Sequence, residues 1–560
     1  MREIDLNAMS KKALILIILI IIVLYGQSLK FPHLLYWDNA GYSYTQHPII
    51  HSLSFTNLKA MFTRSFDNHY HPFTLISLAI DYSLGHGKAV FFRITNLFLL
   101  IFIGLFLFIF IYKLLRNNWA AAFISLFFVL HPFNVESVVW ISERKNLLFM
   151  FFLIPSLIYY LEYIEYKEKR FLLYSCLFFI FSLFSKSQGL PMIGLLFVID
   201  YIKNRKFNRS SIKEKIPYLI IGVVFLIAMF YFHVPANFER THPHRLPDYL
   251  FTGFRNVFFY VYKTLIPFWF SPYYSYPQNP VSSYWFFPVL FILCIWLIFK
   301  YFKRNRLFIA GLLFYFISIF PLLKFFPIPY GNYIAADRHM ILPIIGLAIA
   351  FWSLIVNNVK KGWVWSSVII FLTLLFGSSY YTISQWKNSQ QFYTYLINRQ
   401  PEVVSGWGNR GRVSLSEKKY NEAIRDFSKA IKIKQDNSNL YLNRGLAYAY
   451  LKKFDSAYFN FSEAIRCDSS NFKAYSNRSL TLIQLKKPLE ALNDITCSII
   501  LNPNYVDGWI NKAFIEYKQN NYKQAIESIN RAIELNPQNI KLQYLKNEIL
   551  QEANKNKSLN

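Results

Sequence analysis

The sequence is poor in cysteine and has about half as many acidic as basic residues. Its four cysteines show no CxxC spacing, which argues against a thiol redox motif or a zinc motif. Lys and Arg number 60 against 31 Asp and Glu, and an excess of this size can indicate a nucleic-acid partner. However, 54% of the residues are hydrophobic, and basic cytoplasmic loops of a membrane protein explain the excess more simply. We therefore expect no nucleic-acid partner.

Long apolar runs fill the first two thirds of the chain. Runs such as "ALILIILIIIVLYG" and "LFLLIFIGLFLFIFIY" are too long and too apolar for helices of a soluble protein, so they indicate membrane spans. No small-residue cleavage pattern follows the first run, which we interpret as a retained anchor. We expect about eleven spans, near residues 13–30, 91–112, 119–133, 147–163, 170–186, 189–202, 216–233, 284–300, 307–323, 339–357 and 363–383.

The chain becomes polar from Trp386 onward, and a 34-residue repeat follows. "NRG" at 409–411 recurs as "NRG" at 443–445, "NRS" at 477–479 and "NKA" at 511–513. This period, with small residues where two helices cross, is typical of tetratricopeptide repeats, which stack into a superhelix with a concave binding face. We therefore predict an all-α protein: a polytopic membrane domain over 1–385, a linker and lead-in helix over 386–405, four repeats over 406–541, and a capping helix and tail over 542–560.

Basic clusters orient the membrane half. They occur at residues 11–12, 113–116, 167–170, 203–215, 300–306 and 360–361, and such clusters stay in the cytoplasm. With eleven spans, the N-terminus is then cytoplasmic and the repeats are extracytoplasmic. The apolar stretch 250–270 is expected to be re-entrant or interfacial, because a full crossing would put 300–306 on the wrong side. Three polar stretches, 31–90, 131–146 and 327–340, then share the outer face, where ionisable residues usually mark function.

These polar stretches suit glycosyl transfer from a lipid carrier. A lipid phosphate calls for Arg or Lys, and an acceptor hydroxyl calls for a carboxylate or His that takes its proton. The sequence offers Asp38 as the base and four cations for the phosphate: Arg144, Lys145, Lys186 and Arg338. His71, His131 and Glu136 are further polar side chains expected at this site. We expect no metal, because the sequence shows no DxD pair of the kind that holds a metal beside a nucleotide diphosphate. We expect no cofactor, because the lipid-linked sugar is a substrate.

Each candidate also has a structural interpretation. Asp38 could cap a loop helix, His131–Pro132 could simply end a span, and Arg338 could reach for the membrane interface. Glu136 could form a structural ion pair with Arg144 or Lys145. The aromatic run 273–276 is expected to be part of an interfacial belt.

The order of several motifs gives a family resemblance over nearly the whole chain. They are "WDN" after the first span, "YHPFTLISLAIDY" with "FRITNLFL", "HPFNVESVVWISERKN", "FSKS", "SPYYSYP" and "ADRHMILP", followed by the repeats. The chain resembles the transmembrane and tetratricopeptide-repeat-containing O-mannosyltransferases and their bacterial relatives, which have a GT-C fold. The resemblance implies a polyprenyl-phosphate-sugar donor, an acidic base in the first outer loop, and repeats on the side of the active site.

The chain departs from this family at three positions. Asn39 stands where the family has a second acid, His71 where it has Arg, and Ser187 where it has Glu. Two functions therefore stay open. The first is an inverting glycosyltransferase that moves a sugar, expected to be mannose, to Ser or Thr of exported proteins in a bacterial inner membrane. The alternative is a catalytically inactive membrane scaffold that recruits protein partners through its repeats.

One asparagine recurs at the same position of all four repeats: Asn409, Asn443, Asn477 and Asn511. Asparagine is a mediocre helix former, so its recurrence calls for a reason. A primary amide can both donate and accept hydrogen bonds, and a column of amides could hold the backbone of an extended acceptor protein. Alternatively, these amides bond between neighbouring repeats and stiffen the stack.

Overall fold

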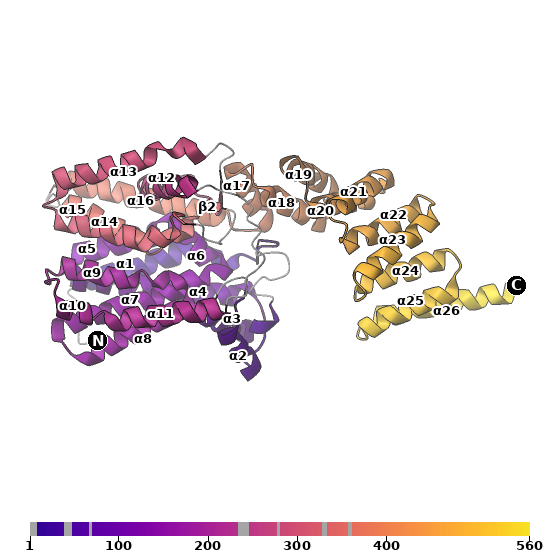
Figure 1. Cartoon of the computed structure of the whole chain (residues 1–560), viewed down its shortest axis with the longest axis horizontal. Helices are drawn as coiled ribbons and strands as arrows, with labels where there is room; N and C mark the ends of the chain where they lie inside the picture. Colours follow the sequence, from indigo (N-terminus) through magenta and orange to yellow (C-terminus); the bar gives the residue numbers. More distant parts are fainter. Residues whose placement is uncertain are drawn as a thin grey trace. The chain divides into compact units, whose positions relative to one another are not determined.

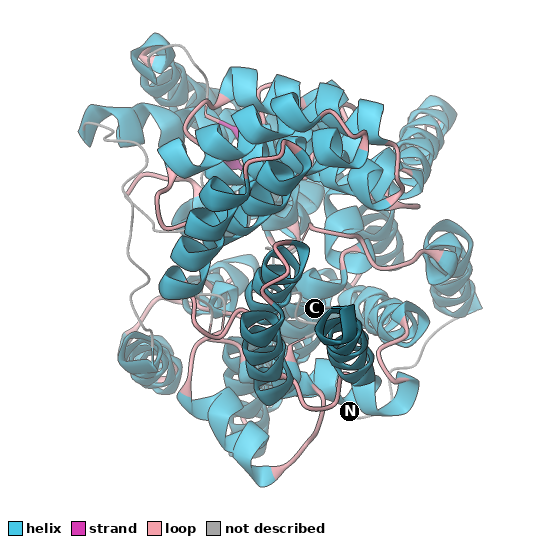
Figure 2. Cartoon of the chain, turned by 90° about the vertical axis from the view of Figure 1, so that its right-hand side faces the viewer, coloured by secondary structure: helices cyan, strands magenta, loops and turns pink. Residues whose placement is uncertain are grey.

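The structure is a computed structural model that describes residues 8–37, 47–66, 70–232, 246–276, 281–326, 333–356 and 361–559. These residues are almost entirely helical, as Figures 1 and 2 show, so the prediction of an all-α protein is confirmed. The chain divides into two compact units, Met1–Gln400 and Pro401–Asn560. The segment 386–405, expected as a linker and lead-in helix, contains helix α17 (Ser389–Arg399), which lies in the first unit.

A helix lies at each of the eleven positions where a span is expected. They are α1 (Ala8–Tyr25), α4 (Ala89–Leu115), α5 (Asn118–Leu130), α7 (Arg144–Tyr166), α8 (Lys169–Ser185), α9 (Met192–Ile202), α11 (Ile216–Phe232), α13 (Phe286–Leu297), α14 (Arg306–Ile319), α15 (Pro343–Ile355) and α16 (Gly362–Ser384). Within the described part, five helical segments are long and apolar enough to cross a membrane, and a bent pair, Asn118–Leu130 with Pro132–Val139, could form a sixth. Several helices of the first unit could thus cross a membrane, but length and composition do not support all eleven.

Further elements connect these helices. They are α2 (Phe55–Thr63), α3 (Pro72–Gly85), α6 (Val135–Val139), α10 (Arg209–Lys213), α12 (Leu246–Leu265), and a two-stranded antiparallel pair of β1 (Tyr274–Ser275) and β2 (Tyr333–Ala335). The stretch expected to be re-entrant forms α12, which is not among the five long apolar helical segments of the described chain. It is fixed in the first unit by the buried Asn256 amide, which donates to the carbonyl oxygens of Leu323 and Ile334 at 3.1 and 2.9 Å.

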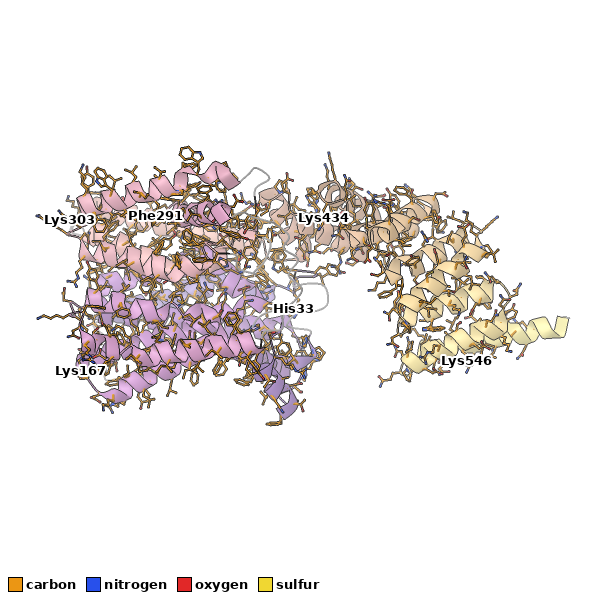
Figure 3. The ribbon with its side chains drawn as sticks, in the orientation of Figure 1. His33, Lys167, Phe291, Lys303, Lys434 and Lys546 are labelled. Atoms are coloured by element: carbon orange, nitrogen blue, oxygen red, sulfur yellow. The ribbon has the colours of Figure 1, made fainter. Side chains whose placement is uncertain are left out.

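The first unit has two chemically different ends. Lys167 and Lys303 lie at one end of its helices, and His33 lies at the other (Figure 3). Contacts between distant loops confirm that basic segments gather at the first end: Lys203 donates to the Lys113 carbonyl at 2.7 Å, and Lys167 pairs with Glu214 at 3.5 Å. Four of the basic clusters expected in the cytoplasm therefore share one end of the first unit.

Two glycines allow α14 and α15 to cross at backbone contact. A Cβ atom on Gly311 would lie 2.5 Å from the backbone nitrogen of Ala350 and 2.6 Å from the carbonyl oxygen of Gly346. Neither neighbour is a flexible side-chain end, so both helix backbones would have to separate. Since α15 leads back to the segment 333–340, this crossing helps to position the polar end of the unit.

The second unit consists of paired helices: α18 (Val404–Ser416) with α19 (Tyr420–Ile433), α20 (Ser438–Tyr450) with α21 (Phe454–Cys467), α22 (Phe472–Gln484) with α23 (Pro488–Leu501), and α24 (Val506–Lys518) with α25 (Tyr522–Leu535), followed by α26 (Ile540–Leu559). The recurring alanines, such as Ala423, Ala457, Ala491 and Ala525, are fully buried where the helices of a pair meet. The turn inside each pair uses one residue with φ near +60°: Lys418, Lys452, Lys486 and Asn520. The four pairs occur where the repeats are expected.

We predict that Gly311→Ala destabilises the first unit by about 1–3 kcal/mol, the usual cost of forcing an extra carbon into a packed core. The measurement is the midpoint of thermal unfolding of the purified full chain in detergent. Gly362→Ala is the matched control, because a Cβ there would meet nothing within 4 Å. Equal midpoints for the two variants would show that the α14–α15 crossing has room to relax.

Candidate functional site

A cavity of about 290 Å³ lies in the first unit; we refer to it as the first cavity. Part of its wall is apolar, formed by Leu190, Pro191, Leu226, Met229, Pro321 and Leu322. The rest of the wall is polar and largely basic, formed by Tyr70, His71, Glu143, Lys145, Lys186, Ser187, Gln188, Ser318, Lys324, Tyr333, Arg338 and His339. The arrangement suits a ligand that has an anionic head and an apolar tail.

Glu143 holds three of the four cations of the first cavity in place. Its carboxylate lies 3.2 Å from Lys145 Nζ, 3.8 Å from Lys186 Nζ and 3.4 Å from Arg338 Nε. The amide of Asn146 donates to the same carboxylate at 2.9 Å. Buried cations repel each other strongly unless a shared anion offsets the repulsion.

Arg338 is fixed by carboxylates and by aromatic rings. Glu136 accepts a hydrogen bond from Arg338 Nη1 at 3.2 Å. The guanidinium lies over the rings of Trp140 and Tyr333, 5.2 Å from each ring centre. Burial works against the charge of Arg338, but Tyr333, Glu143 and Glu136 together raise its pKa, so it stays protonated. Glu136 thus pairs with Arg338, and the pairing with Arg144 or Lys145 considered from the sequence is wrong.

Two lysines of the first cavity titrate closer to neutral pH than free lysine. Burial lowers the pKa of Lys186 to about 7; Glu143 opposes this shift, and Lys145 and Arg338 add to it. Burial, followed by the charge of Arg338, lowers the pKa of Lys324 to about 8. An anionic ligand would favour the charged form of both lysines, so binding and protonation are linked.

His71 lies at the start of α3 and lines the first cavity. Burial and the neighbouring Lys145 lower its pKa to about 3, although Glu143 opposes them. His71 is therefore neutral at physiological pH. It therefore adds no charge at the position where the family that the chain resembles has Arg.

Arg144 is not among the described residues that line the first cavity, so the structure gives its predicted role in phosphate binding no support. Its side chain is fully buried and pairs with Asp81 at 2.5 Å. Its other N–H groups donate to Asn96 Oδ1 at 2.7 Å, to Ser77 and to the Phe92 carbonyl. Arg144 is used to join α3, α4 and α7, while its neighbour Lys145 faces the cavity.

His131 is likewise absent from the wall of the first cavity. Its ring is fully buried, accepts from the Phe133 backbone N–H at 3.3 Å and lies 3.4 Å from the Thr264 carbonyl oxygen. It sits at the break between α5 and the segment Pro132–Val139, where the helix axis bends by 55°. The structural interpretation, that His131–Pro132 ends a helix, is the one the geometry favours.

Asp38 lies outside the described residues, but Trp37 before it is well connected. The Trp37 ring packs against Trp140 at 5.4 Å and against Phe392 at 4.5 Å between ring centres. The same segment is held by Leu35, whose N–H donates to Ser389 Oγ at 2.8 Å and whose carbonyl accepts from the Tyr393 hydroxyl at 2.6 Å. The guanidinium of Arg338 lies over the Trp140 ring, so Trp140 connects Trp37 to a residue in the wall of the first cavity.

Some residues that shape this region were not selected from the sequence. Asp337 is buried and accepts from the Tyr274 hydroxyl at 3.0 Å and from the Ser271 N–H at 3.0 Å. Burial raises its pKa to about 7, against the opposing charge of Lys263. Tyr274 is therefore a buried partner of Asp337, and its assignment to an interfacial belt is wrong. The motifs "SPYYSYP" and "ADRHM" already contained both residues, but no spacing rule pairs them.

Arg93 is a second structural residue that the sequence did not single out. Its guanidinium is buried and donates to the carbonyl oxygens of Phe31, Pro32 and Val139 at 3.1, 2.9 and 2.7 Å. It joins the start of the first polar loop to the end of α6, next to Trp140. The sequence feature that could have identified Arg93 is its place in the motif "FRITNLFL".

The recurring asparagines of the second unit differ in their contacts. Asn443 and Asn477 donate to carbonyls four residues earlier in their own helices, at 2.7 and 2.8 Å. Asn511 instead donates to Ser476 Oγ of the preceding repeat at 2.8 Å. Asn409 is half-buried at the equivalent position. Asn511 thus makes the bond between neighbouring repeats that the structural interpretation expects. Both the stiffening role and peptide binding by the column stay predictions.

Comparison with known proteins identifies the second unit. The family model described as tetratricopeptide repeat matches residues 506–539, and the one described as TPR repeat matches residues 411–452. The second unit therefore contains tetratricopeptide repeats, which generally bind peptides or proteins. No curated protein matches the chain.

The solved structures similar to the chain include two TPR proteins, YrrB and TTC0263, and the protein MamA. YrrB, a TPR protein with an unusual peptide-binding site, is 19% identical, with a TM-score of 0.26 over 35% of this chain and 98% of its own. TTC0263, a thermophilic TPR protein in Thermus thermophilus, is 14% identical, with a TM-score of 0.27 over 29% and 89%. MamA is 16% identical, with a TM-score of 0.25 over 27% and 84%.

We predict that Asn511→Ala loosens the contact between the third and fourth repeats, whereas Asn443→Ala does not, because Asn511 donates to Ser476 of the preceding repeat and Asn443 donates within its own helix. Losing one such bond costs about 1 kcal/mol. Hydrogen-exchange mass spectrometry of the full chain should show faster exchange in α22 and α24 for Asn511→Ala alone. Equal exchange in both variants would contradict the assignment.

Proposed function

We propose that this protein is a membrane-embedded glycosyltransferase that moves a sugar from a polyprenyl-phosphate carrier to Ser or Thr hydroxyls of exported proteins. The observation that supports this proposal is the first cavity, whose wall combines a cluster of cations with a set of apolar residues. The family resemblance read from the motifs agrees with it and suggests mannose as the sugar.

The cations suit a phosphate that gains charge during the reaction. When the bond between the anomeric carbon and the phosphate oxygen breaks, the carrier phosphate leaves with additional negative charge. Four cations, Lys145, Lys186, Lys324 and Arg338, face two carboxylates, Glu136 and Glu143, which leaves a formal excess of two positive charges. Fixed charges aimed at a developing anion stabilise the transition state, because they need no reorganisation.

The apolar wall suits an isoprenoid tail. Leu226 and Met229 come from α11, one of the helices apolar enough to cross a membrane, and Pro321 and Leu322 follow α14. A tail between these segments would enter from the bilayer, while the phosphate stays near Lys186. A soluble sugar nucleotide would have no use for this wall.

Asp38 is the proposed base. It would take the proton of the acceptor hydroxyl as the oxygen attacks the anomeric carbon from the face opposite the phosphate, which inverts the configuration. The contacts of Trp37 with Trp140, and of Trp140 with Arg338, support a position of this segment beside the cavity.

The two ends of the first unit suggest its orientation in the membrane, and the second unit suggests how the acceptor is bound. The end that gathers the basic clusters would face the cytoplasm, so the first cavity would face the outer side of a bacterial inner membrane. The tetratricopeptide repeats would bind the extended acceptor protein. An inactive scaffold is the second candidate, favoured by Asn39 in place of an acid, but a scaffold does not require a buried cation cluster.

We predict that Asp38→Asn lowers turnover by about 10²–10⁴-fold, because general base catalysis contributes rate factors of this size. The assay is mass spectrometry of exported proteins, which should lose a hexose when the variant replaces the native chain. Thermal unfolding should be unchanged. A stable Asp38→Asn protein with normal transfer would exclude Asp38 as the base, and the absence of a hexose with the native chain would favour the scaffold.

We predict that the affinity for a short polyprenyl phosphodiester falls by up to about tenfold from pH 6 to pH 8, since Lys186 loses its proton as pH rises through a pKa of about 7. A phosphodiester keeps one negative charge throughout this range, so the ligand does not contribute to the change. A bound anion raises the pKa of Lys186, which moves the midpoint of the affinity change upward.

Calorimetric titration of the full chain in detergent measures this dependence. Lys186→Met should bind more weakly at pH 6 and show a flatter profile, while Lys303→Met at the opposite end should behave like the native chain. An identical pH profile for native chain and Lys186→Met would remove Lys186 from the donor site.

A further inference from the structure

A second cavity, of about 340 Å³, lies elsewhere in the first unit and shares no wall residue with the first. Three segments form it: the residues 268–270 after α12, the C-terminal turns of α16, and the face of α17 that carries Tyr395 and Arg399. Its wall consists mostly of aromatic rings. Arg399 is the one charged residue in its described wall.

Trp269 is held in a conformation that displays its ring. Its φ is +65°, which is unusual for a bulky residue with a Cβ atom, and its side chain is 68% exposed. Lys263 maintains this conformation, because its ammonium donates to the carbonyl oxygens of Phe268 and Trp269 at 3.0 and 2.6 Å. An unfavourable backbone conformation kept in place by a dedicated side chain suggests a role for the exposed ring.

Arg399 lies in the aromatic wall of the second cavity, and no carboxylate of the described residues forms an ion pair with it. Its guanidinium is 4.8 Å from the centre of the Trp269 ring and 5.5 Å from that of Tyr395. None of the ion pairs found in the described ranges involves Arg399. The hydroxyls of Tyr395 and Thr382 already donate to the carbonyl oxygens of Phe270 and Ser378. The cavity therefore offers a positive charge, with donors in a planar fork, to an anion.

The surroundings of the second cavity resemble the surface that faces a lipid bilayer. It lies over residues 377–382 of α16, one of the five segments apolar enough to cross a membrane. Further along α16, Ile369 and Ile370 are each 61% exposed, and Tyr380 and Tyr381 are about half exposed nearer its end. Aliphatic residues followed by an aromatic girdle mark the boundary between hydrocarbon and headgroups.

We infer that the second cavity binds one anionic phospholipid, with its phosphate on Arg399 and its glycerol region against Trp269 and Tyr381. Its acyl chains would run along the exposed aliphatic side of α16. The charge of Arg399, which no carboxylate of the described residues pairs with, favours a headgroup with a net negative charge over a zwitterionic one, whose own cation would compete. Gly377 leaves the space open, since a Cβ there would meet nothing within 4 Å. This inference does not depend on the proposed glycosyl transfer.

Native mass spectrometry of the full chain in detergent tests the inference, with added dioleoyl phosphatidylglycerol or dioleoyl phosphatidylcholine. We expect one retained phosphatidylglycerol and much weaker retention of phosphatidylcholine. Arg399→Gln should lower the affinity for phosphatidylglycerol by about tenfold or more, the effect of losing a charge-assisted hydrogen bond. Arg304→Gln, an exposed arginine at the opposite end of the unit, is the matched control and should bind normally.

A second variant separates charge from space. Gly377→Leu keeps Arg399 and should fill the cavity, so it should also lose the bound lipid while it unfolds at the native temperature. Equal binding by the native chain, Arg399→Gln and Gly377→Leu would overturn the site. Full competition by millimolar inorganic phosphate would show a site for free anions, and binding of a polyprenyl phosphate in preference to phosphatidylglycerol would assign the cavity to the lipid carrier; either result would also overturn it.

Discussion

The charge balance around Glu143 is the constraint on which the polar end of the first unit depends. Lys145, Lys186 and Arg338 come from three separate segments, and each lies within 4 Å of this one carboxylate. Without an anion among them, three largely buried cations in a medium of low dielectric would drive these segments apart. Glu143 therefore holds these segments together, and it offsets only part of the positive charge of the first cavity.

The helices and the repeats could be predicted from the sequence because their signals are local. Apolar runs place a helix at each of the eleven expected positions, and the 34-residue period places the repeat pairs. The number of crossings could not be settled in this way, since α9, α13, α14 and α15 are apolar but short. Whether a short apolar helix crosses a bilayer depends on its neighbours and its tilt, which the sequence does not encode locally.

The site was predicted only in part, for a geometric reason. Arg144 and Lys145 are adjacent at the start of α7, yet successive helix positions point about 100° apart. Arg144 therefore enters the core and Lys145 enters the cavity. The residue type alone does not tell which of the two cations faces the cavity. Lys324 lines the cavity although it lies in an apolar stretch without any motif. Only the arrangement of the chain in space brings it beside Arg338.

The attachment of Leu35 to α17 has a consequence for the biosynthesis of the protein. The two partners of Leu35, Ser389 and Tyr393, are separated from it by 354 and 358 residues. At the usual rate of translation, about 5–20 residues per second, the N-terminal loop waits on the order of tens of seconds before its partner exists. During this interval the ring of Trp37 lacks Phe392 and Trp386, and the wall beside Trp140 is incomplete. The order of synthesis thus imposes an order of assembly: this corner of the first unit closes only after α17 has been made, late in the synthesis of that unit.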